Sequence, residues 1–391
     1  MYIPFPELEL RLQCIGEALQ AHSVGSILLR SVPNHLYLTG SVYSGYTYVA
    51  VGQKPLFFPD RPTNLFNNTP YEAIPIRKPE QIPALLAEYG LTLGADTVVE
   101  RSFLPQAEYA RLEALTTAGF SPVDGSVLMR KVRSIKTPYE LEEIRAMAKK
   151  HMEIYRLAPQ QWTPGCTDTQ WLHKLEYQMR THGSIGTFRA FGARMEIFMG
   201  NLSAGANADT PAPYDFALGG AGVPAMPMSA NGTQIQQGMP VMVDLAGNYG
   251  VYNTDITRVY AWGKVAPHLQ KAHDLSIALQ HWMMTDVAPG TTAAEIYNHC
   301  AEQVSRAGLQ NHFMGMSFQS KFVGHGVGIE INELPVLTPR DQTPLQPGMV
   351  IALEPKFVFP EGAVGVENTF EVTPNGMQNL TDFPMDIIPL C

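Results

Sequence analysis

The chain has 391 residues, of which 27 are basic and 36 acidic, giving a formal net charge of −9. Hydrophobic residues make up 45% of it and charged residues 16%, below the roughly 25% of typical domains, so large cores and some burial by self-association are expected. No basic stripe and no membrane-length apolar run occurs in the sequence, which argues against nucleic acid and membrane partners. The four scattered cysteines and the lack of a signal-peptide pattern predict a cytoplasmic protein.

Helical and strand patterns alternate over the first 130 residues. Apolar residues at helical spacing predict three helices, over 6–22, 79–89 and 105–118. Short apolar runs predict four strands, over 24–29, 46–51, 55–59 and 97–100. This alternation predicts a smaller α/β domain over residues 1–132.

A helix-start signal follows the charged stretch 130–136. Thr137 is expected as the N-cap, Pro138 at the first helical position, and Glu140 as the partner in a capping box. We therefore expect a second domain, of α+β class, over 133–391. Its four long helical patterns cover 138–158, 167–182, 266–287 and 292–307, with strand-rich and glycine-rich sequence between and after them.

Two aspartates lie on a predicted hairpin over 241–258. A loop centred on Tyr249 and Gly250 places Asp244 directly opposite Asp255, with Cβ atoms about 5 Å apart. Like charges that face each other destabilise a sheet, so a pair in this position indicates a bound cation.

A second predicted hairpin, over 350–367, carries two glutamates. Its turn, 359–362, has proline at the second position and glycine at the fourth, as type I turns prefer. This turn places Glu354 opposite Glu367. Each acid taken alone is more often structural, but two register-matched acidic pairs in one domain favour a metal centre.

An imidazole completes the set, and we expect it from His325, which lies between two glycines. Carboxylate oxygens with one imidazole suit Mn²⁺, Co²⁺, Fe²⁺ or Zn²⁺. Two such ions about 3.5 to 4 Å apart can share carboxylates and a hydroxide. The sequence therefore predicts a centre with two divalent ions.

Five short motifs resemble the metal motifs of the aminopeptidase P, prolidase and methionine aminopeptidase family, the pita-bread metallopeptidases. They are residues 243–247, 255–258, 324–328, 353–355 and 365–368. Residues 133–140 resemble the segment that opens the family's catalytic domain, and residues 34–40 the start of its creatinase-like N-terminal domain. The resemblance implies a pita-bread catalytic domain behind a creatinase-like α/β domain, and a homodimer.

The resemblance also implies roles for individual residues. The implied metal ligands are Asp244, Asp255, His325, Glu354 and Glu367. By the same resemblance, a metal-bridging hydroxide attacks an Xaa-Pro peptide carbonyl, and Glu354 both binds metal and accepts a proton.

Three positions depart from the family pattern. The family usually has a histidine before the first metal aspartate, whereas here Ala212 follows the corresponding phrase and no histidine occurs over 183–267. Asn332 replaces a second histidine seven residues after His325, and we expect it to contact substrate. Gly365 replaces an arginine that is common two residues before the last ligand.

These departures leave three functions open. The leading hypothesis is a metal-dependent exopeptidase that acts on small Xaa-Pro peptides. The second is a hydrolase or lyase of small molecules on the same scaffold, as in creatinase. The third is a binding module without catalytic activity. The glycine- and proline-rich stretch 213–228 is expected to reshape the pocket.

Overall fold

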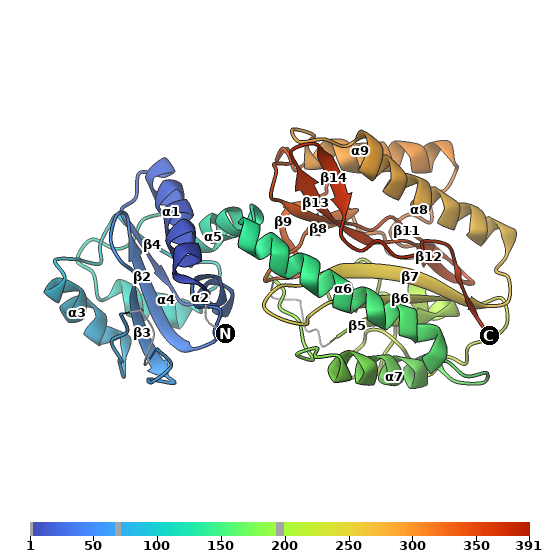
Figure 1. Ribbon diagram of the computed structural model, residues 1–391, viewed down its shortest axis with the longest axis horizontal. Coiled ribbons are helices and arrows are strands. Elements are labelled where there is room, and N and C mark those ends of the chain that lie inside the picture. The colour runs from blue at the N-terminus through green and yellow to red at the C-terminus, as the bar shows by residue number, and fades with distance from the viewer. Residues whose placement is uncertain (1–2, 67–71, 193–198) are drawn as a thin grey trace. The chain divides into compact units, whose positions relative to one another are not determined.

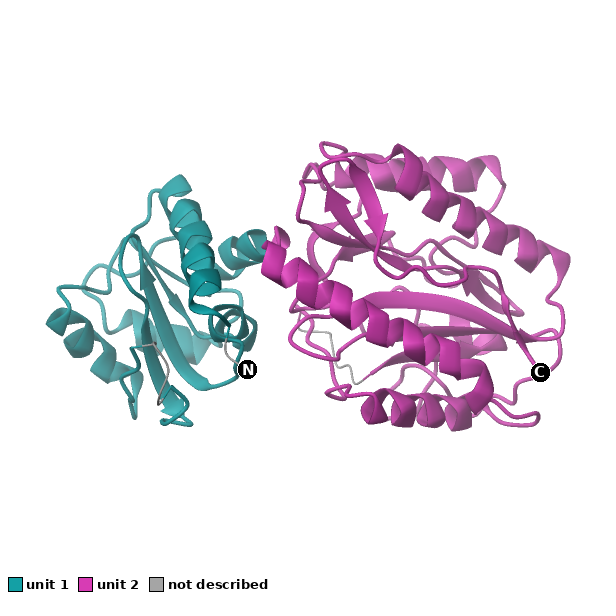
Figure 2. Ribbon diagram, in the orientation of Figure 1, with its two compact units in different colours: residues 1–133 teal, residues 134–391 magenta. Residues whose placement is uncertain are grey.

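The chain forms two compact units, Met1–Arg133 and Ser134–Cys391 (Figure 2). The division predicted from the sequence lies one residue earlier. The computed structural model describes residues 3–66, 72–192 and 199–391. Within these ranges, no helix has both the length and the apolar character needed to cross a membrane.

Unit 1 is a four-stranded sheet with helices, in the strand order β3-β2-β1-β4 (Figure 1). Its strands are β1 (Ser26–Leu29), β2 (Ser44–Ala50), β3 (Leu56–Arg61) and β4 (Thr97–Val99). Its helices are α1 (Phe5–Ala21), α2 (Val32–Thr39), η1 (Pro79–Gln81), α3 (Ile82–Glu88), α4 (Gln106–Glu113) and α5 (Gly125–Ser134). The parallel pairing of β1 with β4 and the antiparallel pairing of β1 with β2 make it a mixed α/β sheet.

Two helices of unit 1 are absent from the sequence prediction. Helix α2 has only eight residues and ends at Gly40, whose left-handed conformation terminates the helix. Helix α5 includes most of the charged stretch 130–136, from which the boundary between the domains is predicted. Its last turn carries Lys131 and Arg133, which favourably oppose the negative end of the helix dipole.

Unit 2 contains four long helices, all near the predicted positions: α6 (Pro138–Gln161), α7 (Asp168–Thr181), α8 (Pro267–Asp286) and α9 (Ala293–Arg306). The predicted cap of α6 is confirmed, because the Glu140 amide donates to the Thr137 hydroxyl at 3.2 Å and the Thr137 amide donates to the Glu140 carboxylate at 3.0 Å. The same capping box starts α7 at Thr167 and α9 at Thr292.

Three sheets lie between these helices. One has the order β15-β7-β6-β5, the second β14-β13-β10-β8-β9, and the third is the pair β11-β12. The bounds are β5 (Gly200–Ala204), β6 (Pro240–Ala246), β7 (Asp255–Trp262), β8 (Gly324–Gly326), β9 (Glu333–Val336), β10 (Val350–Leu353), β11 (Lys356–Phe359), β12 (Gly362–Gly365), β13 (Asn368–Thr373), β14 (Gly376–Asn379) and β15 (Ile388–Leu390). A short 3₁₀ helix, η2 (Gly205–Asp209), follows β5.

Two apolar cores hold unit 2 together. Helices α6 and α7 bury residues such as Ile154 and Trp171 against the sheet that contains β6 and β7. Helices α8 and α9 bury residues such as Met283 against the sheet that contains β10 and β13, and Figure 1 shows α7 and α9 on opposite sides of the sheets. The predicted acidic ligands lie on or next to β6, β7, β10 and β13, which are interior strands of these two sheets.

Candidate metal centre

The register of the first hairpin differs from the prediction. Strand β6 pairs with β7 so that Asp244 faces Thr257, and Ala246 faces Asp255. This register is shifted by two residues from the predicted one. Two bonds between the ends of the loop fix it: the Gly247 amide donates to the Thr254 carbonyl at 2.7 Å, and the Thr254 amide donates to the Gly247 carbonyl at 3.2 Å. Since side chains alternate with a period of two, a shift of two keeps both aspartates on one face, as diagonal rather than direct neighbours.

The register of the second hairpin is confirmed. Lys356 pairs with Gly365 in the β11–β12 ladder, and Leu353 pairs with Asn368 in the β10–β13 ladder, both in the predicted register. Glu354 and Glu367 lie in the gap between these two ladders and therefore face each other. The bridge between Thr257 and Glu367 joins this gap to β7.

Two side chains of helix α8 form hydrogen bonds with the backbone groups in the gap between the ladders. The Ser276 hydroxyl donates to the Pro355 carbonyl at 2.6 Å and accepts from the Val366 amide at 2.9 Å. One turn later, the Gln280 amide donates to the carbonyls of Leu353 at 2.8 Å and Val366 at 2.7 Å. The backbone on both sides of Glu354 and directly before Glu367 is thus held by two buried side chains of one helix.

Five of the sequence-predicted residues come together at this place. The Nε2 atom of His325 lies 3.6 Å from Glu354 Oε1 and 3.8 Å from Asp255 Oδ2. One ligand atom each from Asp255, His325 and Glu367 lie within 4.8 Å of one another. Asp244 reaches the same cluster through a shared partner, Lys356.

Lys356 is a residue of the cluster that the sequence did not single out. Its side chain is fully buried, and its Nζ donates to Glu354 Oε2 at 2.6 Å, Asp244 Oδ2 at 2.8 Å and Glu367 Oε2 at 3.2 Å. The spacing in the sequence could have indicated it, because a lysine two residues after Glu354 in an extended apolar run has its side chain on the same face as Glu354.

The electrostatics of the cluster leave it short of positive charge. Burial and then Glu367 and Asp244 raise the pKa of Asp255 well above its usual range, and burial raises the pKa of Glu367 to about 8. Burial opposes the charge on Lys356, but its carboxylate partners outweigh this and raise its pKa well above the usual value. The cluster therefore has four carboxylates but a single ammonium group, which contacts three of them, and a further cation would stabilise their ionised forms.

The residues present fit a divalent ion on the histidine side of the cluster. Ligand atoms bound to one ion at about 2.0 to 2.2 Å lie about 3 to 4 Å from each other, as the nitrogen and oxygen atoms do here. The Nδ1 atom of His325 lies 3.1 Å from the Gly326 carbonyl, a contact that places the proton on Nδ1 and leaves Nε2 free to bind metal. Burial also lowers the pKa of His325, which favours the neutral ring.

Glu367 gives a second sign of a missing partner. Its Oε2 accepts from the Thr257 hydroxyl at 2.7 Å, whereas its buried Oε1 has no hydrogen-bond partner among the described residues. A buried carboxylate oxygen without a partner is costly, and a bound cation removes that cost. The Arg258 guanidinium, itself buried, donates to the Glu367 carbonyl at 2.7 Å and fixes the main chain at this residue.

Asn332 lies in the loop between β8 and β9 and bonds the main chain of Phe191. Its Oδ1 accepts from the Phe191 amide at 2.7 Å, and its Nδ2 donates to the Phe191 carbonyl at 2.8 Å. The neighbouring Ile331 amide donates to the Arg189 carbonyl at 2.7 Å. The carboxamide therefore ties the segment around Phe191 to the loop that follows His325.

Gly365 has no space for a side chain. Its φ is +150°, and an added Cβ would lie 2.6 Å from the Pro355 carbonyl oxygen and 2.9 Å from Lys356 Cα. An arginine does not fit at this position in the present backbone. The positive charge on this hairpin comes from Lys356 on the opposite strand instead.

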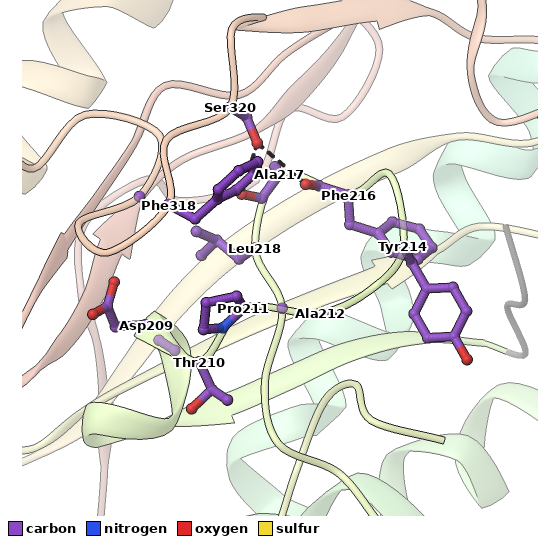
Figure 3. Close-up of a pocket in the computed structure, with 13 residues that line it drawn as sticks. Asp209, Thr210, Pro211, Ala212, Tyr214, Phe216, Ala217, Leu218, Phe318 and Ser320 are labelled. Atoms are coloured by element: carbon purple, nitrogen blue, oxygen red, sulfur yellow. Dashed lines mark hydrogen bonds between the residues drawn. The ribbon is translucent and has the colours of Figure 1, made fainter. Parts of the chain in front are cut away.

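A pocket is lined by residues 208–212, 214 and 216–219, of which the last five belong to the glycine- and proline-rich stretch, together with Gly315, Phe318 and Ser320 (Figure 3). Asn201 pairs with Asp244 across the β5–β6 ladder, so their side chains share one face. The Asn201 carboxamide donates to the Gly219 carbonyl at 2.8 Å, and Gly219 lines the pocket. The pocket wall is thus anchored one strand away from Asp244, with Ala212 and Phe318 also bordering it.

Comparison with known proteins gives the same fold and domain order. Residues 142–374 match the model of metallopeptidase family M24, and residues 11–135 match the creatinase/prolidase N-terminal domain. The chain is 25% identical to the Xaa-Pro dipeptidase of Pyrococcus horikoshii over 382 residues, which covers 96% of this chain and 97% of that protein.

Solved structures agree. The Xaa-Pro dipeptidase from Bacillus anthracis superimposes with a TM-score of 0.80 at 22% identity, covering 98% of this chain and 100% of that one. The prolidase from Pyrococcus horikoshii OT3 gives 0.78 at 22% identity, covering 96% and 99%. The predicted creatinase-like domain followed by a pita-bread domain is confirmed. The chain therefore belongs to metallopeptidase family M24.

Proposed function

We propose that this protein is a divalent-metal-dependent exopeptidase that cleaves Xaa-Pro peptides. The observation that supports this most directly is the buried cluster of four carboxylates and His325 in a chain of the M24 family. The substrate class is taken from its relatives, since the Pyrococcus horikoshii protein is named an Xaa-Pro dipeptidase. The same expectation arises from the sequence motifs.

In this proposal the ligands are the five residues that the sequence predicts. They are Asp244, Asp255, His325, Glu354 and Glu367. A bound divalent ion supplies Lewis acidity, which polarises the peptide carbonyl and makes water a stronger nucleophile. The mixture of carboxylate and imidazole ligands suits Mn²⁺, Co²⁺, Zn²⁺ or Fe²⁺.

Glu354 is the proposed proton acceptor. Burial raises the pKa of its carboxyl group, which brings it closer to the range in which a carboxylate is an effective general base. Its position is fixed by α8, through the bonds of Gln280 and Ser276 to the residues on either side. Glu354 can therefore accept a proton from the attacking water without a change in the backbone.

The pocket anchored by Asn201 is proposed to border the substrate. Its lining is mostly small or apolar, and its volume of about 40 Å³ admits only a small part of a peptide. Asn332 is proposed to border the substrate through the segment that it holds, because its carboxamide is already bonded to Phe191. The homodimer and the cytoplasmic location stay predictions.

A panel of dipeptides tests the proposal. Protein reconstituted with Mn²⁺ or Co²⁺ is expected to hydrolyse at least one Xaa-Pro dipeptide and to lose activity on chelation. Glu354→Gln should abolish turnover, while Glu361→Gln, an exposed control in the turn of the same hairpin, should leave turnover unchanged. Hydrolysis by Glu354→Gln at the wild-type rate would reject the role given to Glu354.

If the metal-loaded protein cleaves no Xaa-Pro peptide, the exopeptidase assignment is wrong. Activity on a small non-peptide amide would then favour the second hypothesis of the sequence, a small-molecule hydrolase on this scaffold. Lack of metal binding would reject both enzymatic alternatives.

A further inference from the structure

Lys356 lies in the middle of the proposed metal site, between chain segments that are far apart in the sequence. Its Nζ reaches one carboxylate from β6, one from the residue after β10 and one from the residue before β13, at 2.6 to 3.2 Å. All three bonds are charge-assisted, and the side chain has no exposure to solvent. An ammonium group so placed does what a cation would do for these three carboxylates.

We infer that the Lys356 ammonium permanently replaces one of the two expected metal ions, so that the centre binds a single divalent ion beside His325. This inference rests on the proposed function, because it concerns the number of ions in the proposed site. The remaining ligands would be Asp255, His325, Glu354 and Glu367.

Each of the two glutamates has one oxygen bonded to Lys356 and a second oxygen that is not bonded to it. We call the two parts of the cluster the lysine side and the histidine side. Glu354 turns Oε2 to Lys356 and leaves Oε1 3.6 Å from the histidine nitrogen. Glu367 gives Oε2 to Lys356 and Thr257, and its Oε1 has no hydrogen-bond partner within the described parts of the chain. The three N–H donors of Lys356 are therefore all used, and the histidine side retains free acceptors.

Lys356 cannot easily give way to a second ion. Its backbone is held in the ladder with Gly365, and its carbonyl accepts from the Met314 amide at 2.8 Å. A metal ion bound to the same three carboxylates would lie within the van der Waals radius of Nζ and would repel its charge. Moving Lys356 away would bury an ammonium without partners, which is strongly unfavourable.

The hairpin that carries Lys356 requires a glycine opposite it. An added Cβ at Gly365 would lie 2.6 Å from the Pro355 carbonyl oxygen and 2.9 Å from Lys356 Cα, whereas its 3.4 Å distance from Lys356 Cγ is an ordinary contact. A glycine at 365 and a lysine at 356 are thus parts of one arrangement, in which the fixed charge comes from β11.

Metal stoichiometry tests the inference. Metal-free protein is dialysed against saturating Mn²⁺, and bound manganese is measured by elemental analysis. The wild type is expected to bind one ion per chain and Lys356→Ala two, because the substitution frees three carboxylates and the space of the side chain. Lys136→Ala is the matched control: Lys136 is also buried and ion-paired, at 3.2 Å from Glu333, but contacts none of the proposed ligands, so this variant should bind one ion.

A second measurement needs no variant. Electron paramagnetic resonance of the wild type with bound Mn²⁺ should show the hyperfine pattern of an isolated ion, whereas two ions about 3.5 to 4 Å apart would show exchange coupling. Two coupled ions in the wild type, or one ion in folded Lys356→Ala, would overturn the inference and leave the proposed metalloenzyme standing. No bound manganese in the wild type would overturn both.

Discussion

Gly365 lies directly opposite Lys356 in the β11–β12 hairpin, and the backbone of the lysine leaves it no room for a Cβ. Its φ of +150° belongs to a region that is essentially restricted to glycine. Gly365 thus allows the backbone conformation of the hairpin, and Lys356 supplies the positive charge at the centre.

Gly365→Ala should destabilise the metal-free protein by about 3 kcal/mol or more, because strain in φ adds to the close contact with the Pro355 carbonyl. The free energy of unfolding from urea titrations measures this. Gly165→Ala is the control, since Gly165 also has a positive φ of +84° but nothing within 4 Å of an added Cβ. Equal losses in the two variants would show that the close contact has no cost.

Gln280→Leu should weaken metal binding about 10- to 100-fold, as loss of groups that orient ligands commonly does. The variant leaves the carbonyls of Leu353 and Val366 without their buried donor, so it should also lower the free energy of unfolding by about 1 to 3 kcal/mol. Calorimetric titration with Mn²⁺ measures the affinity. Gln270→Leu, at a half-buried position on the same helix where, among the described residues, the side chain bonds only Asp274, should change neither quantity.

Divalent metal should stabilise the folded protein. An ion that binds only the folded state adds about 2.7 kcal/mol at a concentration 100-fold above Kd, so Tm should rise on loading and fall back after chelation. His325→Ala removes the only imidazole near the carboxylates within the described chain and should greatly reduce the rise. A rise in Tm of the same size in His325→Ala would place the ion elsewhere.

The buried ring of His151 should lower the stability of the folded protein as the pH falls below about 6.5. Its ring is fully buried, its Nδ1 lies 3.0 Å from the Thr254 hydroxyl oxygen, and burial lowers its pKa to about 3. Between that value and the unfolded pKa of about 6.5, the unfolded chain binds a proton that the folded chain does not. The stabilising effect of a neutral His151 is therefore complete above pH 6.5 and is lost as the pH falls towards 3.

His151→Gln should reduce this pH dependence. One proton contributes about 1.4 kcal/mol per pH unit to the slope of the unfolding free energy, and the variant should lack that share between about pH 6 and 4. Urea titrations at several pH values in the presence of chelator give the slope. An unchanged slope would contradict a buried neutral histidine at this position.

Local sequence patterns were sufficient for much of the fold and for the proposed ligand set. The capping box at Thr137 marked the start of α6, and the turn at 359–362 gave the correct register for Glu354 and Glu367. Even the wrong register of the first hairpin left Asp244 and Asp255 on one face, because a slip of two residues preserves the alternation of side chains. Such features depend on contacts between residues close in the chain.

The tertiary structure alone decided what surrounds Lys356. A lysine in an apolar strand can extend its ammonium group to solvent, and nothing in its neighbourhood in the sequence excludes that. Only the approach of β6 to the gap between the ladders brings Asp244, 112 residues away, to the same nitrogen as Glu354 and Glu367. The sequence thus determined which acids share a face, whereas long-range packing determined that a lysine lies among them.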